Sequence, residues 1–174
     1  MSGMNKILSF DPEKEQITVE SGTRLIDIFE EIHWRSLYVA ASPTESHSSV
    51  AGAICANVNG KEAWKVGSFA HQVVRLSLML ADGEILDIDR EHELFNAVVG
   101  GIGMLGVILD VTLQLTRIKS PYMHIDRIPA TNADALLTKM AQIEKDYDAA
   151  VVWVDAYAHG HRTGRSVIHA SKWI

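Results

Sequence analysis

Hydrophobic and polar residues follow short, regular patterns along this chain. Predicted strands are alternating or β-branched apolar runs bounded by turn residues; they are Ile17–Val19, Leu37–Val39, Val73–Leu80, Glu84–Asp89, Leu105–Leu115, Tyr122–Ile128, Ala149–Val154 and Ser166–His169. Predicted helices have apolar residues at helical spacing; they are Leu25–Trp34, Arg90–Val99 and a helix starting at Thr131 with Asp134 as a partial capping box. Hairpin turns such as Asp82-Gly83 replace regular βαβ alternation, so the pattern predicts an α+β fold.

Two parts are expected along the chain. Ser120-Pro121 interrupts the pattern of strands and is the candidate boundary. We therefore predict one domain over residues 1–119 and the beginning of a second over residues 120–174. The length of 174 residues suits one domain and does not exclude two small ones.

Composition narrows the class of protein. Apolar residues make up 47% of the chain, as in a globular protein, and the net charge of −6 argues against nucleic acid as a partner. The single cysteine, Cys55, excludes an internal disulfide framework, which favours a reducing, cytoplasmic location. No apolar stretch approaches the length of a membrane span, and the run Ile7–Phe10 is too short for a signal peptide.

The strongest functional signal is a run of small residues from Ser48 to Ala56. Serine, glycine and alanine leave little side-chain bulk there, so the backbone could approach a flat ligand closely. Asn57, Asn59 and Lys61 follow at once, with Gly60 forming a turn. Because a packed core needs bulky apolar residues, this segment predicts a wall for a large planar cofactor.

Other motifs in the sequence give weaker evidence for a functional site. Gly101–Gly106 matches the dinucleotide pattern G-x-G-x-x-G, but a helix precedes it and a strand follows, so we expect a glycine turn and no NAD site. His159 and His161 have no third ligand at a recognisable spacing, and no metal site is expected. His47 precedes the small-residue run and could contact a ligand. Cys55 lies among apolar residues, where a thiol is normally inert.

An ordered set of segments carries a family resemblance. The segments are ITVESGTRLIDIFEEI, the loop at Pro43, SVAGAICANVNGK, VGSFAHQVVRLSLMLADGEI, ELFNAVVGGIGMLGVILDVTL and, more weakly, VVWVDAYAHGHRTGR. Together they resemble the PCMH-type FAD-binding domain of the vanillyl-alcohol oxidase / p-cresol methylhydroxylase flavoproteins. The sugar-oxidising branch that includes decaprenylphosphoryl-ribose oxidase is the most similar. The resemblance implies a mixed or antiparallel sheet flanked by helices, the second subdomain of such a domain, followed by the first elements of a substrate domain.

The resemblance also implies a cofactor and a reaction. FAD, bound non-covalently, would accept hydride at N5 from a C–H of a sugar or alcohol, so the expected partner is a small, sugar-like substrate. Positions that match cofactor contacts in relatives are Thr44, Ser49, Val50, Ala51, Gly52, Ala56, Asn57, Val58, Asn59 and Ile108. No catalytic residue is assigned.

Departures from the family pattern qualify that expectation. Thr44-Glu45 stands where relatives have Gly-Thr, and Ala51 replaces a glycine. Asn59 stands where substrate-branch relatives often have histidine; an amide can hydrogen-bond but cannot carry a proton.

Relatives also have a pyrophosphate-binding subdomain before this region and a longer substrate domain after it. We therefore expect a chain truncated at both ends that is inactive alone. The surfaces left exposed would favour self-association or a partner chain. The alternative function is a catalytically inactive remnant of the FAD domain that serves as a binding or assembly module.

Overall fold

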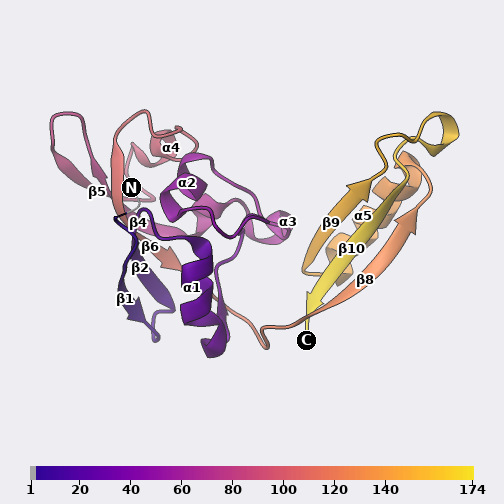
Figure 1. The fold of residues 1–174 in the computed structure, drawn as a ribbon, viewed down its shortest axis with the longest axis horizontal. Coiled ribbons are helices and arrows are strands. Elements are labelled where there is room, and N and C mark those ends of the chain that lie inside the picture. The colour runs from indigo at the N-terminus through magenta and orange to yellow at the C-terminus, as the bar shows by residue number, and fades with distance from the viewer. Residues whose placement is uncertain (1–2) are drawn as a thin grey trace. The chain divides into compact units, whose positions relative to one another are not determined.

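The computed structural model describes residues 3–174 and divides the chain into two compact units, Met1–Ile118 and Lys119–Ile174 (Figure 1). Each unit has its own sheet and its own hydrophobic core. The α+β fold class is confirmed, because antiparallel strands dominate both units and helices pack beside them.

Unit 1 contains a five-stranded antiparallel sheet in the order β1-β2-β6-β4-β5. Its strands are β1 (Ile7–Asp11), β2 (Gln16–Glu20), β4 (Val73–Met79), β5 (Ile85–Asp89) and β6 (Val107–Gln114). A small second sheet pairs β3 (Leu37–Tyr38) with β7 (Thr116–Arg117). The helices of unit 1 are α1 (Leu25–Ile32), α2 (Val50–Cys55), α3 (Ala63–Val66) and α4 (Phe95–Val98), with 3₁₀ turns η1 (His33–Arg35) and η2 (Phe69–Gln72).

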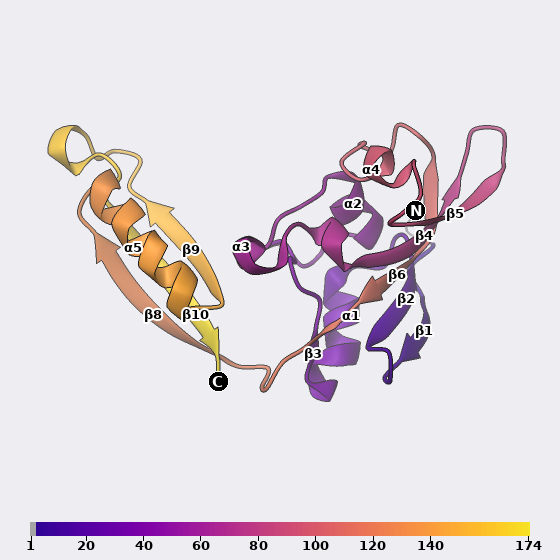
Figure 2. The same ribbon diagram turned by 180° about the vertical axis from the view of Figure 1, so that it is seen from behind.

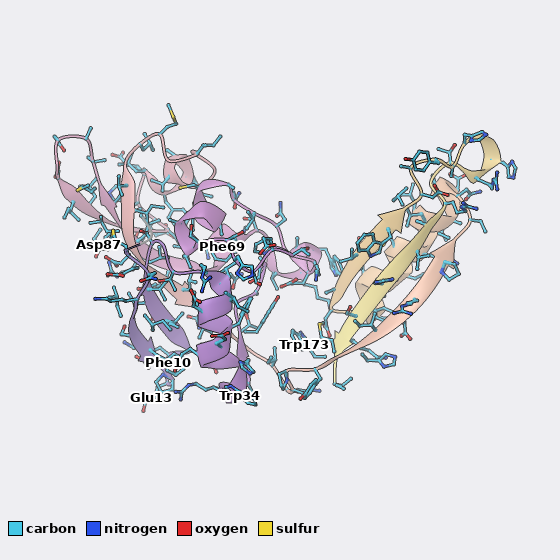
Figure 3. The ribbon with its side chains drawn as sticks, viewed as in Figure 1. Phe10, Glu13, Trp34, Phe69, Asp87 and Trp173 are labelled. Carbon is cyan, nitrogen blue, oxygen red and sulfur yellow. The ribbon has the colours of Figure 1, made fainter. Side chains whose placement is uncertain are left out.

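One face of the five-stranded sheet is apolar and the other is polar. In the registers Ile17↔Leu113 and Val19↔Val111, all four side chains are buried in the core shared with α1 and α2. Phe69, labelled in Figure 3, is the largest fully buried side chain of this core. The alternate residues lie on the polar face, where Thr18 and Thr112 hydrogen-bond across the strands at 2.9 Å.

Several elements differ from the sequence-based predictions. The hairpin of β4 and β5 is confirmed, whereas β1 was not predicted. The helix predicted over Arg90–Val99 is reduced to α4, because the Asp89 carboxylate accepts hydrogen bonds from the backbone N–H groups of Glu91 and His92 at 3.0 Å each. This local turn competes with helix formation in residues 90–94.

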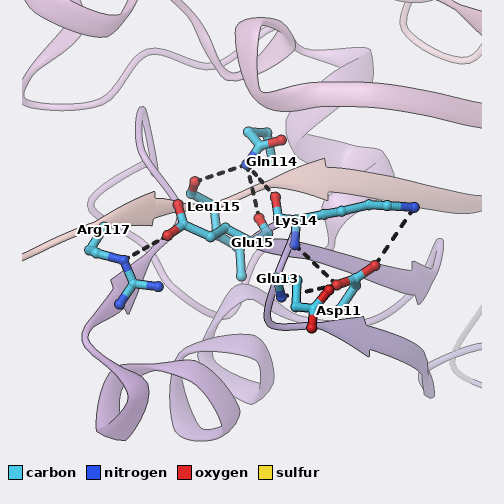
Figure 4. A network of polar contacts seen from close by, with 7 residues as sticks. All are labelled: Asp11, Glu13, Lys14, Glu15, Gln114, Leu115 and Arg117. Atoms are coloured by element: carbon cyan, nitrogen blue, oxygen red, sulfur yellow. Dashed lines mark hydrogen bonds and ion pairs between the residues drawn. The ribbon is translucent and has the colours of Figure 1, made fainter.

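A polar network fastens the turn between β1 and β2 to the end of β6 (Figure 4). The Gln114 side-chain amide donates to the carbonyl oxygens of Lys14 at 3.0 Å, Glu15 at 3.1 Å and Leu115 at 3.3 Å. Glu15 has a left-handed φ of 54° and its carboxylate accepts from Arg117 Nε at 2.6 Å. The network therefore gives hydrogen-bond donors to backbone carbonyls that no strand pairing satisfies.

Replacing Gln114 with leucine is expected to lower the free energy of unfolding of unit 1 by about 1–2 kcal/mol, because partly buried carbonyls lose their donor. Urea denaturation followed by circular dichroism measures this change. Lys14→Ala is the matched control, because it keeps the backbone carbonyl that Gln114 contacts. It removes only a side chain that is 72% exposed, whose Nζ lies 3.8 Å from Asp11 Oδ2. Equal stability of the leucine variant and the wild type would contradict the network's role.

Unit 2 is a three-stranded antiparallel sheet in the order β8-β10-β9, with one long helix. The elements are β8 (Met123–Ala130), α5 (Ala133–Asp146), β9 (Ala149–Val154), the 3₁₀ turn η3 (Gly160–Arg162) and β10 (Ser166–Trp173). Figure 2 shows α5 lying across one face of this sheet, where Ile143 packs against Ile168 and Ala170. Asn132, and not Thr131, caps α5: its side-chain oxygen accepts from the Ala135 N–H at 2.9 Å.

An ion pair closes the loop between β9 and β10. The Arg165 guanidinium donates to the Asp155 carboxylate, which also accepts from the Tyr157 N–H at 2.9 Å. Arg165 first, and then the Tyr157 amide, hold the pKa of Asp155 below its usual range. The charged carboxylate is therefore the form that the folded loop prefers.

The pH dependence follows from the sign of this shift. The contribution of Asp155 to stability is present above the unfolded-state pKa of about 3.9, and it disappears as the pH falls through the lower folded-state pKa. We expect the Tyr157 amide resonance to titrate with a midpoint below about 3.9 by NMR, and this step to vanish in Asp155→Asn. Glu144→Gln, on the exposed side of α5, should keep the step. A midpoint at or above the unfolded value would refute the assignment.

Candidate cofactor site

The small-residue run folds into the short helix α2. Ser49 has extended backbone angles and its Oγ accepts a hydrogen bond from the Gly52 N–H at 3.2 Å, which starts the helix. Val50, Ala51, Ala53 and Ile54 point into the core. Ser49, Gly52 and Ala56, spaced three and four residues apart, lie on the opposite, more exposed side. The solvent-facing side of α2 therefore carries only small side chains.

A hollow of about 540 Å³ lies against that side of α2. We call it the α2 hollow; it is lined by Gly52, Cys55, Ala56, Gly100, Ile102 and Gly103. Backbone hydrogen bonds fix its two walls together, from Gly100 N–H to Ile54 O and from Ile102 N–H to Cys55 O, both at 3.1 Å. Its volume is in the range of ligand pockets, and four of its six lining residues are glycine or alanine.

The glycine turn before β6 supplies half of this lining. Gly100 and Gly103 have left-handed φ values of 73° and 74° that favour glycine. A Cβ on Gly101 would lie 2.2 Å from the Ala97 carbonyl oxygen, so close packing explains that glycine. Sequence reasoning treated the turn as structural and did not assign Gly100, Ile102 or Gly103 to a site, although the doubled glycines were a usable signal for close approach.

Ile102 has an unusual conformation at the edge of the α2 hollow. Its φ is 52°, a left-handed value that is strained for a β-branched residue, and its side chain is 82% exposed. The hydrogen bond from its N–H to Cys55 O holds this conformation. Strain of this kind is found at ligand sites more often than elsewhere.

Asn57 lies beside the α2 hollow and has an unused hydrogen-bond acceptor. Its φ is 43°, and its Cβ lies 3.7 Å from the position a Cβ would take on Gly100. Its Oδ1 is buried and has no hydrogen-bond partner within residues 3–174. A buried amide oxygen in this state can be satisfied by a donor on a bound ligand. The small-residue cradle and this orphan acceptor both fit a large heterocyclic cofactor.

The structure brings only some of the predicted contact residues to the surface. Gly52 and Ala56 line the α2 hollow, and Thr44 and Asn59 are exposed. Ser49, Asn57 and Val58 are half-buried. The side chains of Val50, Ala51 and Ile108 are in the core, at 0%, 4% and 3% exposure, so contact with a ligand would have to come from their backbone.

Local contacts describe the state of two side chains that the sequence offered as possible functional groups, Cys55 and His47. Burial raises the pKa of the Cys55 thiol, opposed by a hydrogen bond from the Gly103 N–H, so the thiol remains protonated at neutral pH. His47 is exposed, and its backbone N–H donates to the Glu45 carboxylate at 2.8 Å, which turns that charge toward its own loop. Within residues 3–174, no three His, Cys, Asp or Glu side chains gather as a metal site would require.

Comparison with known proteins identifies the family. A sequence profile of the family described as "FAD binding domain" matches residues 1–89, half of the chain. The chain belongs to this FAD-binding domain family. FAD is thus the cofactor of the domain, and the PCMH-type resemblance seen in the sequence is confirmed.

Two relatives of this FAD-binding domain are oxidases by name. The chain is 28% identical over 172 residues to decaprenylphosphoryl-beta-D-ribose oxidase of Mycolicibacterium smegmatis, covering 97% of the chain and 37% of that protein. It is 30% identical over 183 residues to L-gulonolactone oxidase of Mus musculus, covering 100% of the chain and 40% of that protein. The chain thus spans about two fifths of the length of these two relatives.

A solved structure shows the same fold. An alkyldihydroxyacetonephosphate synthase superposes with a TM-score of 0.79 at 13% identity, over 99% of this chain and 38% of that protein. Within residues 3–174, no helix has the length and apolar character to cross a membrane.

Proposed function

We propose that the FAD-binding domain holds FAD non-covalently at the α2 hollow. One observation carries this proposal. The exposed side of α2 and the turn of Gly100 to Gly103 both have little side-chain bulk and line the same hollow, and Asn57 lies beside it. Gly52, Ala56 and the glycine turn would let the cofactor approach the backbone. Asn57 Oδ1 would accept a hydrogen bond from it, and Thr44 and Asn59 are the further expected contacts.

The reaction we propose for the intact protein is oxidation of a sugar or alcohol. The redox chemistry would come from bound FAD, as the acceptor of the hydride that leaves the substrate C–H. The residues of this chain would bind and orient the cofactor; Asn59 can donate and accept hydrogen bonds but cannot move a proton. The sugar-derived names of the relatives support this substrate class.

We assign the two units to different tasks. Unit 1 would be the second subdomain of the FAD-binding domain, because the family match and the α2 hollow both fall within it. Unit 2 would begin the substrate domain. Residues 3–174 present no group that we assign as a catalytic base, so we expect this chain alone to be inactive in turnover.

The visible spectrum of the purified chain tests cofactor binding. We expect flavin absorbance, or its appearance on titration with FAD, and release of intact FAD on denaturation as a non-covalent complex requires. Flavin that stays with the denatured polypeptide would contradict the non-covalent attachment. A colourless protein that takes up no FAD at saturating concentration would overturn the proposal.

A second candidate is a non-catalytic binding or assembly module that associates with itself. Apolar side chains at the glycine turn favour it, since Ile102 and Met104 are 82% and 86% exposed and Leu105 is 40% exposed. Light scattering after size-exclusion chromatography separates the two candidates. A colourless oligomer favours the assembly module, and a monomer that binds FAD tightly excludes it.

A further inference from the structure

A strained alanine lies in the loop that leads to Thr44. Ala41 has a left-handed φ of 55° and is completely buried. For a residue with a Cβ this conformation is less favourable than the right-handed one, so neighbouring contacts must hold it. Gly60 packs directly against it: a Cβ on Gly60 would lie 2.6 Å from Ala41 Cα.

The side chain of Glu62 supplies the holding contacts. Its Oε1 accepts a hydrogen bond from the Ala41 N–H at 2.9 Å. The Tyr38 hydroxyl also hydrogen-bonds to the Glu62 carboxylate. Burial, and after it the charge of Glu62, raises the pKa of Tyr38, so the phenol stays protonated and can donate. One carboxylate thus joins β3, the loop after it and the N-terminal end of α3.

The segments that Glu62 joins are the two that carry expected cofactor contacts outside α2. Thr44 follows Ala41 by three residues, and Asn59 immediately precedes Gly60. Asn59 is itself held by a β-bridge to Ser68, so the Gly60 turn is a fixed support for the Ala41 loop. A further internal contact, from Ser42 Oγ to Val39 O at 2.6 Å, stiffens the loop but does not connect it to residues 59–62.

We propose that Glu62 is a positioning residue for the flavin site, whose carboxylate fixes the Thr44 loop against the Asn59-Gly60 turn before FAD arrives. This inference rests on the proposed FAD function. Without Glu62, the Ala41 N–H loses its acceptor and Ala41 can leave its strained conformation, which would shift the loop that carries Thr44. Cofactor binding would then have to order the loop, and the affinity would fall.

Three variants of the full chain test this role. In Glu62→Ala we expect FAD affinity to fall about tenfold, as loss of a hydrogen bond to a charged group predicts. Glu62→Gln should stay within about threefold of wild type, because its amide oxygen still accepts from Ala41 and its NH₂ can donate to Tyr38. Glu84→Ala, an exposed carboxylate in the β4–β5 hairpin, is the matched control and should leave affinity unchanged.

Hydrogen exchange without FAD supplies a second measurement. We expect the Ala41 amide to exchange at least about tenfold faster in Glu62→Ala, with β2 and β6 amides unchanged. Faster exchange throughout unit 1 would indicate a merely structural role and overturn the inference. Wild-type FAD affinity in Glu62→Ala, with a wild-type chain that binds FAD, would also overturn it. A wild-type chain that binds no FAD would instead overturn the proposed function, and the flavin role of Glu62 with it.

Discussion

Replacing Ala56 with leucine is expected to weaken FAD binding about 100-fold, or ~2.7 kcal/mol of binding free energy. Ala56 is exposed at the end of α2 and lines the α2 hollow opposite Gly100 and Gly103. A leucine side chain would fill space that the flavin needs. The facing glycine turn cannot move away, because backbone hydrogen bonds from Gly100 and Ile102 hold it to α2. Titration of the apoprotein with FAD, followed by the change in flavin fluorescence, gives the two dissociation constants.

Ala81→Leu is the control for the added apolar bulk. Ala81 is exposed at the β4–β5 turn, outside the α2 hollow, so this variant should bind FAD like the wild type. Both substitutions are at exposed positions, and both should leave the free energy of unfolding within about 0.5 kcal/mol of the wild type. If Ala56→Leu binds FAD as tightly as Ala81→Leu, the cofactor does not occupy the α2 hollow.

Replacing Gly106 with alanine is expected to lower the free energy of unfolding of unit 1 by about 3 kcal/mol. A Cβ at this position would lie 2.4 Å from the Met79 carbonyl oxygen and 3.3 Å from Leu78 Cδ1. Both neighbours belong to β4, which pairs with β6 in the centre of the sheet, so the strands must separate to admit the methyl group. Urea denaturation of the wild type and the variant measures the difference.

Substitutions at two other glycines are controls that distinguish the cost of steric overlap from the cost of backbone strain. Gly103→Ala meets open space but has a φ of 74°, so it should cost only about 1–2 kcal/mol. Gly3→Ala meets no atom within 4 Å and should be neutral within about 0.5 kcal/mol. A loss in Gly106→Ala no greater than that in Gly103→Ala would show that β4 and β6 tolerate the extra methyl group.

The sequence predicted best those elements whose signals are local. The β4–β5 hairpin has the Asp82-Gly83 turn between two apolar runs, and β6 shows Asp110, Thr112 and Gln114 on one side of alternating apolar residues. β1 escaped prediction because it is an edge strand with Leu8 51% exposed, and its pairing with β2 supplies the order that its own sequence lacks.

The site was predicted only in part for a similar reason. Serine, glycine and alanine show little contrast between an apolar and a polar side, so periodicity could not reveal that Val50–Cys55 forms a helix. The run indicated close approach, but not which residues of α2 turn inward. The role of Glu62 depends on Ala41, 21 residues earlier, and no pattern within a short window records such a contact.

The order of strands in unit 1 also has a consequence for how the chain folds. The central strand, β6, is the last of the five to be synthesised, and it inserts between the hairpins β1–β2 and β4–β5. Gln16 and its partner Gln114 are 98 residues apart, which at ribosomal speed separates their synthesis by about 5–20 s. During translation the two hairpins can form early by local contacts, whereas the sheet and the turn of Gly100 to Gly103 that it supports must wait for β6. Insertion of this strand, the least local event in the unit, is therefore expected to set the folding rate.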